Sequence, residues 1–444
     1  MTFQECEDYI LSVPKFAGKL GTEELSKILE LMGHPERDCP VIHVAGTNGK
    51  GSTCSFLASI LRQAGKRVGV FTSPHLIKIT ERIRIGKKLI SEEDFTACFE
   101  ETMEYVKQAK EKGISHPSFF ELLFLMAALY FRKQKTEYVI YETGMGGRLD
   151  ATNVVSPEVC VITSVGMDHM QYLGNTLSQI AGEKAGIIKR GVPVVFFDRK
   201  DESTNVIKQT AKKLNAPFFS VEKSQYKLLK IANKVIDFSF NSGYYRYCQL
   251  SIRQTGLYQI ENAMLAVKAF ELIRNSLDSG CGRSSDSAIR EQEMDWIRAG
   301  LLSMVWPGRM EQIADRVFID GAHNEEAIEA FCHTLEVLFP SEQKRLLFAV
   351  SEDKDYETMI GRLCRIPFAE VILVRYEGSR AAELDTVAEV FRHFSGSRIT
   401  AFDDLRAGFS YGMSHVEDSY LFCVGSLYLA GDLLRVGRND HDKF

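Results

Sequence analysis

The feature that most constrains this fold is the stretch 41–53, which reads VIHVAGTNGKGST. Five mostly apolar residues predict a buried strand, a glycine-rich turn follows, and apolar spacing over 52–64 predicts a helix. This arrangement is typical of a polyphosphate site, because backbone N–H groups and the helix N-terminus converge on the anion. Lys50 would add a point charge and Ser52 a hydroxyl for Mg²⁺, although Gly51 between them departs from the standard Walker spacing. The alternative is an ordinary turn that contains a chance lysine.

Size and composition exclude several classes of protein. A chain of 444 residues is too long for one ordinary core and predicts two or three domains. The net charge of −5, without a block of basic residues, argues against nucleic-acid binding. The ten cysteines form no CxxC pair, so we expect reduced thiols in a cytoplasmic protein. The acidic start is no signal peptide, and the longest apolar run, 119–131, is interrupted by Glu121 and too short to cross a membrane.

The order of the predicted elements indicates the fold class. Runs of strand residues alternate with helical segments from residue 41 to about 219, which predicts a mostly parallel sheet with helices on both faces. Ligands should then gather beyond the carboxyl ends of the strands. The alternating segment 79–85 predicts a further strand, and the stretches 235–240 and 244–250 predict an appended antiparallel hairpin.

A second, smaller α/β series follows. Predicted strands at 316–319, 345–350, 371–374 and 420–424 alternate with helices and indicate a Rossmann-like C-terminal domain. We expect the boundary near residue 300, which divides the chain into 1–300 and 301–444.

Polar residues at strand ends are the candidates for chemistry. Glu142 is a Mg²⁺ ligand or a surface carboxylate, and the sequence favours neither. Asp168–His169 could supply a second metal ligand or an acid–base pair, or be an ordinary loop pair. Lys184 lies within a predicted helix and is expected on these grounds alone to be a solvated surface lysine. In the second domain, Asp320 could bond a ribose hydroxyl and Arg309 a phosphate, or each could form a loop salt bridge.

Eleven short motifs follow one another in a fixed order along nearly the whole chain: GTNGKGS at 46–52, TSPHL at 72–76, TERI at 80–83, FFE at 119–121, GMGGRLDATN at 144–153, DH at 168–169, EKAGI at 183–187, PGR at 307–309, DGAHN at 320–324, DKD at 353–355 and GSLY at 425–428. Each alone is weak, but the ordered set is specific. It resembles the folylpolyglutamate synthase/dihydrofolate synthase family of the Mur ligase superfamily. One departure is Trp306, where leucine usually precedes Pro-Gly-Arg.

The resemblance implies an ATP-dependent ligase, with 1–300 as the ATP-binding domain and 301–444 as the glutamate-ligase domain. ATP would phosphorylate a carboxylate of tetrahydrofolate, or also of dihydropteroate, and the amine of L-glutamate would attack the acyl phosphate. The implied partners are these small molecules, with no nucleic acid and no membrane, and a monomer is expected. The alternatives are a P-loop NTPase without ligase activity and another Mur-type amino-acid ligase. The latter carries a full N-terminal domain for its UDP sugar, whereas about forty residues precede the loop here.

The resemblance also implies roles for individual residues. Mg²⁺ would bind at two sites formed by Ser52, Glu142 and His169, and Lys184 matches a lysine that is carbamylated. The ATP-binding set would be Thr47, Asn48, Gly49, Lys50, Gly51, Ser52, Thr53, Asn262, Arg309 and Asp320. The catalytic set would be Lys50, Lys184, His169, Ser73 and His323. The set that borders the other substrates would be Ser73, Phe120, Asp150, Asp353 and Lys354.

Overall fold

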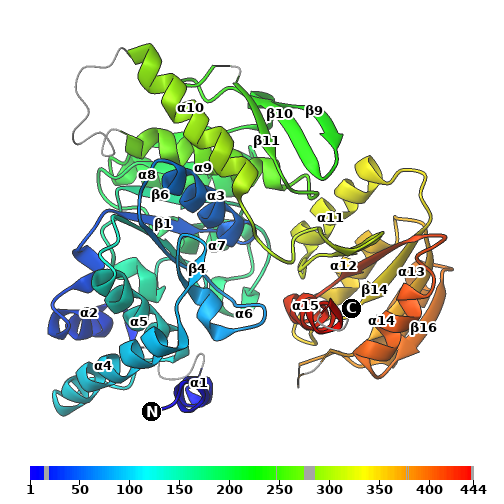
Figure 1. The fold of residues 1–444 in the computed structure, drawn as a ribbon, viewed down its shortest axis with the longest axis horizontal. Coiled ribbons are helices and arrows are strands. Elements are labelled where there is room, and N and C mark those ends of the chain that lie inside the picture. The colour runs from blue at the N-terminus through cyan, green and yellow to red at the C-terminus, as the bar shows by residue number, and fades with distance from the viewer. Residues whose placement is uncertain (15–19, 247, 275–285, 377, 379, 442–444) are drawn as a thin grey trace.

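The computed structural model describes residues 1–14, 20–246, 248–274, 286–376, 378 and 380–441 (Figure 1). The chain forms an eight-stranded sheet, a three-stranded sheet and a six-stranded sheet. In Figure 1 the eight-stranded sheet and its helices lie on the left, the three-stranded sheet lies near the top centre, and the six-stranded sheet with its helices forms a separate body on the right. The predicted α/β class, with a second and smaller α/β part, is therefore confirmed.

The eight-stranded sheet carries the glycine loop at its centre. Its strands lie in the order β4-β3-β2-β5-β1-β6-β7-β8, with parallel pairing from β2 to β8 and antiparallel pairing of β3 and β4 at one edge. Since β1 lies between β5 and β6, the residues that follow these three strands meet at one edge. The strands are β1 (Val41–Ala45), β2 (Val68–Phe71), β3 (Ile83–Ile85), β4 (Lys88–Leu89), β5 (Tyr138–Glu142), β6 (Val159–Ile162), β7 (Val194–Phe197) and β8 (Phe218–Val221).

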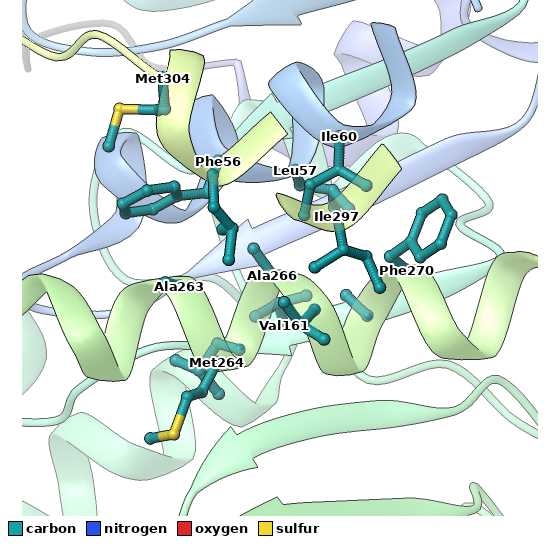
Figure 2. Packing of buried hydrophobic residues seen from close by; sticks show 14 of the residues in the cluster. Phe56, Leu57, Ile60, Val161, Ala263, Met264, Ala266, Phe270, Ile297 and Met304 are labelled. Carbon is teal, nitrogen blue, oxygen red and sulfur yellow. The ribbon is translucent and has the colours of Figure 1, made fainter. Parts of the chain in front are cut away.

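Helices cover both faces of this sheet, as the alternating pattern predicts. One face packs against α3, α9 and α10, where Phe56 and Ile60 lie close to Ala266 and Ile297 (Figure 2). Side chains alternate along β1, so Ile42 faces this cluster while Val41 belongs to the core on the opposite side. The helices are α1 (Phe3–Ser12), α2 (Gly21–Leu31), α3 (Lys50–Gln63), α4 (Glu92–Glu111), α5 (Phe119–Lys133), α6 (Met170–Leu173), α7 (Leu177–Ala185), α8 (Glu202–Lys213), α9 (Gln259–Ile273) and α10 (Asp286–Ser303), with 3₁₀ turns η1 (Pro35–Arg37), η2 (Ile79–Arg82), η3 (Ala151–Val154) and η4 (Lys223–Gln225).

The prediction of one strand over 79–85 is wrong in its first half. The 3₁₀ turn η2 occupies Ile79–Arg82, and only Ile83–Ile85 pairs in the sheet as β3. The cause is the carboxylate of Glu81, which accepts the backbone N–H groups of Leu76, Ile77 and Lys78 at 2.7, 3.0 and 2.9 Å. These bonds close a turn between residues 76–78 and Glu81, so the chain joins the sheet only at Ile83.

The appended antiparallel unit is larger than the predicted hairpin. It is a sheet in the order β11-β10-β9, formed by β9 (Tyr226–Ala232), β10 (Val235–Phe240) and β11 (Cys248–Ile252). The predicted strand 235–240 is β10, whereas the prediction of a strand over 244–250 is wrong at 244–246, since β11 begins at Cys248. β10 and β11 pair antiparallel, and β9 adds a third strand along the other edge of β10.

The six-stranded sheet has the order β12-β13-β17-β14-β15-β16 and is parallel except for the pair of β12 and β13. Helices α11, α12 and α13 contribute to the core on one face, and α14 and α15 to the core on the other. We propose a domain boundary near residue 300, where α10 leads into the connecting segment 304–310. The elements are β12 (Glu311–Ala314), β13 (Val317–Ile319), α11 (Glu325–Leu338), β14 (Lys344–Phe348), α12 (Tyr356–Leu363), β15 (Phe368–Val374), α13 (Leu384–Phe394), β16 (Arg398–Phe402), α14 (Leu405–Met413), β17 (Tyr420–Val424) and α15 (Leu427–His441).

Among the described residues, no helix combines the length and the apolar character that a membrane crossing requires.

Candidate active site

The glycine loop connects β1 to α3 and is shaped by its neighbours. Gly46 has φ +156° and Gly49 has φ +83°, values that favour glycine. Space is also limiting, because a Cβ atom would lie 1.8 Å from Thr163 Oγ1 at Gly46 and 2.2 Å from Asn262 Oδ1 at Gly49. The amine of Lys50 donates to the carbonyls of Gly46 and Thr47 at 3.1 and 3.2 Å. The lysine therefore lies within the loop whose amides would receive an anion.

Two cavities meet at this loop. The first has a volume of about 610 Å³ and is lined by Lys50, Glu142 and Lys184 among others. The second has a volume of about 920 Å³ and is lined by Asn262 and Asp320 among others. Four residues line both cavities: Asn48, Gly49, Ser52 and Arg309. A ligand held by the loop could therefore extend into either cavity.

Glu142 and Ser73 lie together at the wall of the first cavity. The Glu142 carboxylate, at the end of β5, is buried and accepts the backbone N–H of Ser73 at 3.1 Å. Burial raises the pKa of Glu142 to about 7, while the charge of Lys50 opposes that rise. The alternative of a surface carboxylate is wrong, since Glu142 is 2% exposed.

Lys184 is buried, which contradicts the expectation from helical position alone that it is a surface lysine. Its side chain reaches from α7 to the loop, where Nζ donates to the carbonyl of Gly46 at 2.8 Å. Burial lowers the pKa of Lys184 to about 7, and the charge of Lys50 adds to the effect. An amine with such a pKa is half neutral at neutral pH, unlike an ordinary lysine.

Asp168 connects the two bodies of the chain. Its carboxylate accepts a hydrogen bond from Lys354 Nζ at 2.7 Å and from Asn324 Nδ2 at 3.2 Å, and His323 Nε2 lies at 3.8 Å. Burial works to raise the pKa of Asp168, but the surrounding charges outweigh it and hold that pKa below its ordinary value. The side chain of the adjacent His169 is 42% exposed, and its Nε2 lies 4.0 Å from Asp168.

Asp150 and Phe120 form another part of the first cavity. The Asp150 carboxylate is buried and accepts the N–H groups of Gly144 and Met145 at 2.9 and 3.0 Å and the hydroxyl of Thr152 at 2.6 Å. Asp150 thus organises the loop that borders the cavity. The ring of Phe120 lies against Gly144, where a Cβ would approach it to 2.9 Å.

The second cavity brings Asp320 and Arg309 together. Asp320 is buried and accepts hydrogen bonds from the Tyr258 hydroxyl at 2.5 Å and from the N–H groups of Met310 and Ala322, each at 2.8 Å. Burial raises the pKa of Asp320, and the charge of Arg309 opposes this. The carboxylate is therefore fixed at the cavity wall by three donors.

The remaining predicted residues divide between the cavities and the interior. His323, Asp353 and Lys354 line the first cavity together with His169. Thr53 is fully buried in the first turns of α3 and lines neither cavity. Of the predicted ATP-binding set, Thr53 is thus the member that the structure separates from the others.

The sequence motifs missed three residues of the site: Ser164, Glu326 and Gln259. The Asn48 amide donates to Asn324 Oδ1 at 3.1 Å and to Glu326 Oε2 at 2.9 Å, and Ser164 Oγ donates to the same Glu326 oxygen at 2.9 Å. Gln259 Nε2 donates to Ser52 Oγ at 3.2 Å. The Gln259 and Asn262 side chains are three residues apart on α9 and hydrogen-bonded at 2.9 Å, and that helical spacing is the one pattern that could have indicated a pair.

The donors near the loop fit a magnesium ion. Ser52 offers a hydroxyl, Glu142 a carboxylate and His169 a ring nitrogen, all at the wall of the first cavity. The described residues contain no cluster of three or more His, Cys, Asp or Glu side chains that could hold a metal ion by themselves. A hard cation that keeps waters and takes phosphate oxygens as ligands suits such a sparse set, whereas a zinc site would need more protein ligands.

Comparison with known proteins gives consistent matches over most of the chain. The Mur ligase middle domain matches residues 44–270, and the Mur ligase glutamate ligase domain matches residues 308–427. The chain is 38% identical over 371 residues to the dihydrofolate synthase/folylpolyglutamate synthase of Bacillus subtilis, covering 83% of this chain and 84% of that protein.

Solved structures agree with these sequence matches. The folylpolyglutamate synthase of Mycobacterium tuberculosis complexed with ADP is similar with a TM-score of 0.85 and 28% identity, over 98% of both chains. The E. coli FolC protein in complex with DHPP and ADP is similar with a TM-score of 0.82 and 27% identity, over 99% of both chains.

Proposed function

The chain belongs to the folylpolyglutamate synthase/dihydrofolate synthase family of Mur ligases, and from this membership we propose which substrates and residues it uses. It is an ATP-dependent ligase that adds L-glutamate to a folate, with tetrahydrofolate as the proposed acceptor and dihydropteroate as a second one. Neither another Mur-type ligase nor an uncoupled P-loop NTPase is favoured by the comparisons.

The reaction has two covalent steps. An oxygen of the acceptor carboxylate attacks the γ-phosphorus of ATP, which gives an acyl phosphate and releases ADP. The amine of glutamate, after losing a proton, then attacks the acyl carbon, and phosphate leaves as the amide forms. Phosphorylation is needed because a carboxylate is a poor electrophile that lacks a leaving group.

The observation that carries the proposal is the meeting of two cavities at one phosphate loop. The nucleoside of ATP would occupy the second cavity, in contact with Asn262, Arg309 and Asp320. Its phosphates would lie along the loop amides beside Lys50, so that the γ-phosphate enters the first cavity. The acceptor carboxylate would approach there, in a site that excludes water when filled.

Magnesium would be held at two positions, one by Ser52 and Glu142 and one by Glu142 and His169. When bound, it neutralises the phosphate oxygens and their developing charge. Residues of the chain would position these magnesium ligands. Gln259 fixes the Ser52 hydroxyl by the hydrogen bond at 3.2 Å, and the Ser73 N–H holds the Glu142 carboxylate in place at 3.1 Å.

Lys184 is proposed to act as a carbamate. CO₂ adds only to a neutral amine, and the pKa of Lys184 near 7 makes that form abundant at neutral pH. The carbamate would be an anion close to the cations of the site, with Lys50 among them.

The other substrates are assigned to two groups of residues that line the first cavity. Ser73, Phe120 and Asp150 would border the pterin and the carboxylate to be activated. Asp353 and Lys354 would receive glutamate, and burial lowers the pKa of His323 to about 4, so that this imidazole stays neutral beside them.

We further infer a monomer that works in a reducing cytoplasm. One chain supplies the walls of both cavities, and the described cysteines are free.

One assay tests the proposed function. Purified protein is mixed with Mg-ATP, L-glutamate and either tetrahydrofolate, dihydropteroate or a UDP-muramoyl acceptor, and both phosphate and ligated product are measured. We expect equal amounts of phosphate and product with a folate acceptor, and neither when glutamate or the acceptor is omitted. Phosphate release that ignores both glutamate and the pterin would refute the proposal. Product from the UDP-muramoyl acceptor alone would reassign the substrate.

A further inference from the structure

The connecting segment 304–310 contacts the phosphate loop through one tryptophan. The indole ring of Trp306 lies against Gly51, where a Cβ atom would be 2.3 Å from Cζ2 and 2.9 Å from Cε2 of the ring. Gly51 lies within α3 and is absent from the glycines with positive φ, so its backbone does not require glycine. In this structure, the ring of Trp306 occupies the space that a side chain at position 51 would need.

Arg84 holds the same ring from the sheet. Its Cζ lies 4.9 Å from the centre of the Trp306 ring, and its Nη2 donates to Ser55 Oγ at 2.6 Å. Ser55 lies on α3, one turn after Gly51. A guanidinium over an indole face attracts the ring, and more strongly when both are shielded from water. The ring is thus fixed to α3 directly and through Arg84.

The other end of the connecting segment is fixed to the second body. The carbonyl of Gly308 accepts the N–H of Gly321 at 2.9 Å, next to Asp320. Arg309 Nη1 lies 2.6 Å from where a Cβ of Gly321 would be, so its guanidinium crosses the same turn. Arg309 follows Trp306 by three positions, and three residues of chain span at most about 10 Å. The place of the ring therefore limits where Arg309 can lie.

We propose that Trp306 is a positioning residue for the nucleotide: seated on Gly51 and held by Arg84, it keeps the connecting segment on the phosphate loop, so that Arg309 lies at the wall shared by the two cavities. The inference rests on the proposed function only for the identity of the nucleotide. Without the ring, Met304 still anchors the start of the segment in the core of the first body and the Gly308–Gly321 bond still anchors its far end, but the stretch between them loses its contact with the phosphate loop. Nucleotide binding should weaken, while Lys50, Glu142 and Lys184 stay in place for the chemical steps.

The first test compares Trp306→Ala, Trp306→Phe and the control Trp296→Phe, which alters the other tryptophan, on α10. Affinity for ADP is measured by titration calorimetry and the KM for ATP by steady-state kinetics. We expect Trp306→Ala to weaken ADP binding about tenfold with kcat within about threefold of wild type, and Trp306→Phe to keep most of the affinity. Equal ADP affinity in all three variants would overturn the inference, as would a loss in kcat alone.

A second test uses the close approach of the ring to Gly51. Gly51→Ala should displace the indole and weaken ADP binding, whereas in the double variant Gly51→Ala/Trp306→Ala the added methyl group meets no ring. The double variant should therefore bind ADP no worse than Trp306→Ala. The control is Gly361→Ala in α12, where a Cβ would meet Phe394 at an ordinary 3.5 Å. If the losses in ADP binding free energy of the two single variants simply add up in the double variant, the proposed contact between Gly51 and Trp306 is refuted.

Fluorescence gives a readout that does not depend on folding of the variants at position 306. With two tryptophans in the chain, Trp296→Phe leaves Trp306 as the sole emitter. Its emission should change on addition of ADP and saturate at the calorimetric dissociation constant, and an unchanged emission counts against the inference. If ADP binding behaves as expected while no folate is ligated, the proposed acceptor is wrong and the role of Trp306 stands.

Discussion

The buried amine of Lys184 leads to a prediction about stability as well as activity. In the folded protein its pKa is lowered to about 7 from 10.5, chiefly by burial. Between these two values the unfolded chain binds a proton that the folded chain has released. The free energy of unfolding must therefore rise with pH across the window from about 7 to 10.5. Below pH 7 the buried amine is charged in the folded protein, and its full destabilising effect on the fold is present. Replacing Lys184 with methionine removes this titration and leaves an unbranched side chain that is one atom shorter.

The magnitude follows from the pKa and from one hydrogen bond. A fall from 10.5 to about 7 destabilises the folded state by about 5 kcal/mol at pH 6, since each pKa unit is worth about 1.4 kcal/mol. The variant loses the hydrogen bond to the Gly46 carbonyl at 2.8 Å, which offsets about 2 kcal/mol. Lys184→Met should thus be more stable than wild type by about 3 kcal/mol at pH 6, and by close to zero at pH 9.

The assay is thermal unfolding in CO₂-free buffer at both pH values. A gain of about 3 kcal/mol should raise the midpoint of the variant by about 5 °C at pH 6. Lys212→Met, which changes an exposed lysine on α8, is the control and should show no such pH-dependent gap. Ligase activity of Lys184→Met should be lost, because the variant cannot form a carbamate. A variant that is less stable at pH 6, or a gap that is the same at both pH values, would refute the reasoning.

Three other outcomes are expected. Lys50→Ala should lose nearly all turnover with an unchanged thermal midpoint, because its amine bonds to loop carbonyls rather than to a carboxylate; retained turnover would remove its phosphate role. Because burial raises the pKa of Glu142 to about 7, the Mg²⁺ concentration for half-maximal rate should rise as the pH falls below 7. Glu142→Gln should need more Mg²⁺ at every pH and lose that dependence, and an unaltered profile would contradict the metal role. Asp168→Asn, which weakens the ion pair to Lys354 at 2.7 Å, should raise the KM for glutamate about tenfold in steady-state kinetics; an unchanged KM would show that this contact does not order the site.

The sequence predicted the parts of the fold that depend on local periodicity. The alternation of strand and helix segments was enough to predict a parallel sheet covered on both faces. The buried side of each element can be read from the spacing of its own apolar residues. It failed at 79–82, where the Glu81 carboxylate draws three backbone N–H groups into a turn. A period-two pattern cannot reveal that a side chain will compete for those groups.

The sequence could identify residues of the candidate site, but it could say less about the burial and the neighbours of each residue. Glu142 could be placed at a strand end, yet only the strand order sets β5 beside β1 and so buries the carboxylate next to the loop. For Lys184 the position within a helix led to a wrong prediction, that of a surface side chain. It is buried since the Gly147 turn lies directly on α7, where a Cβ would meet the Glu183 carbonyl at 2.7 Å, and since its amine reaches the Gly46 carbonyl.

The contacts between the two bodies could not be predicted from the spacing of residues in the sequence. Asn48 and Asn324 are 276 residues apart, and each belongs to a motif that makes sense by itself. Gly51 is a second residue whose contact with a distant segment the sequence did not show. Within the loop it reads as one more glycine that lets a phosphate approach, but the Cβ position at Gly51 points into the ring of Trp306. A substitution there would act first on the connecting segment and only through it on Arg309. In this chain, a residue of the phosphate loop therefore contacts a distant segment as well as lining the cavity for the ligand.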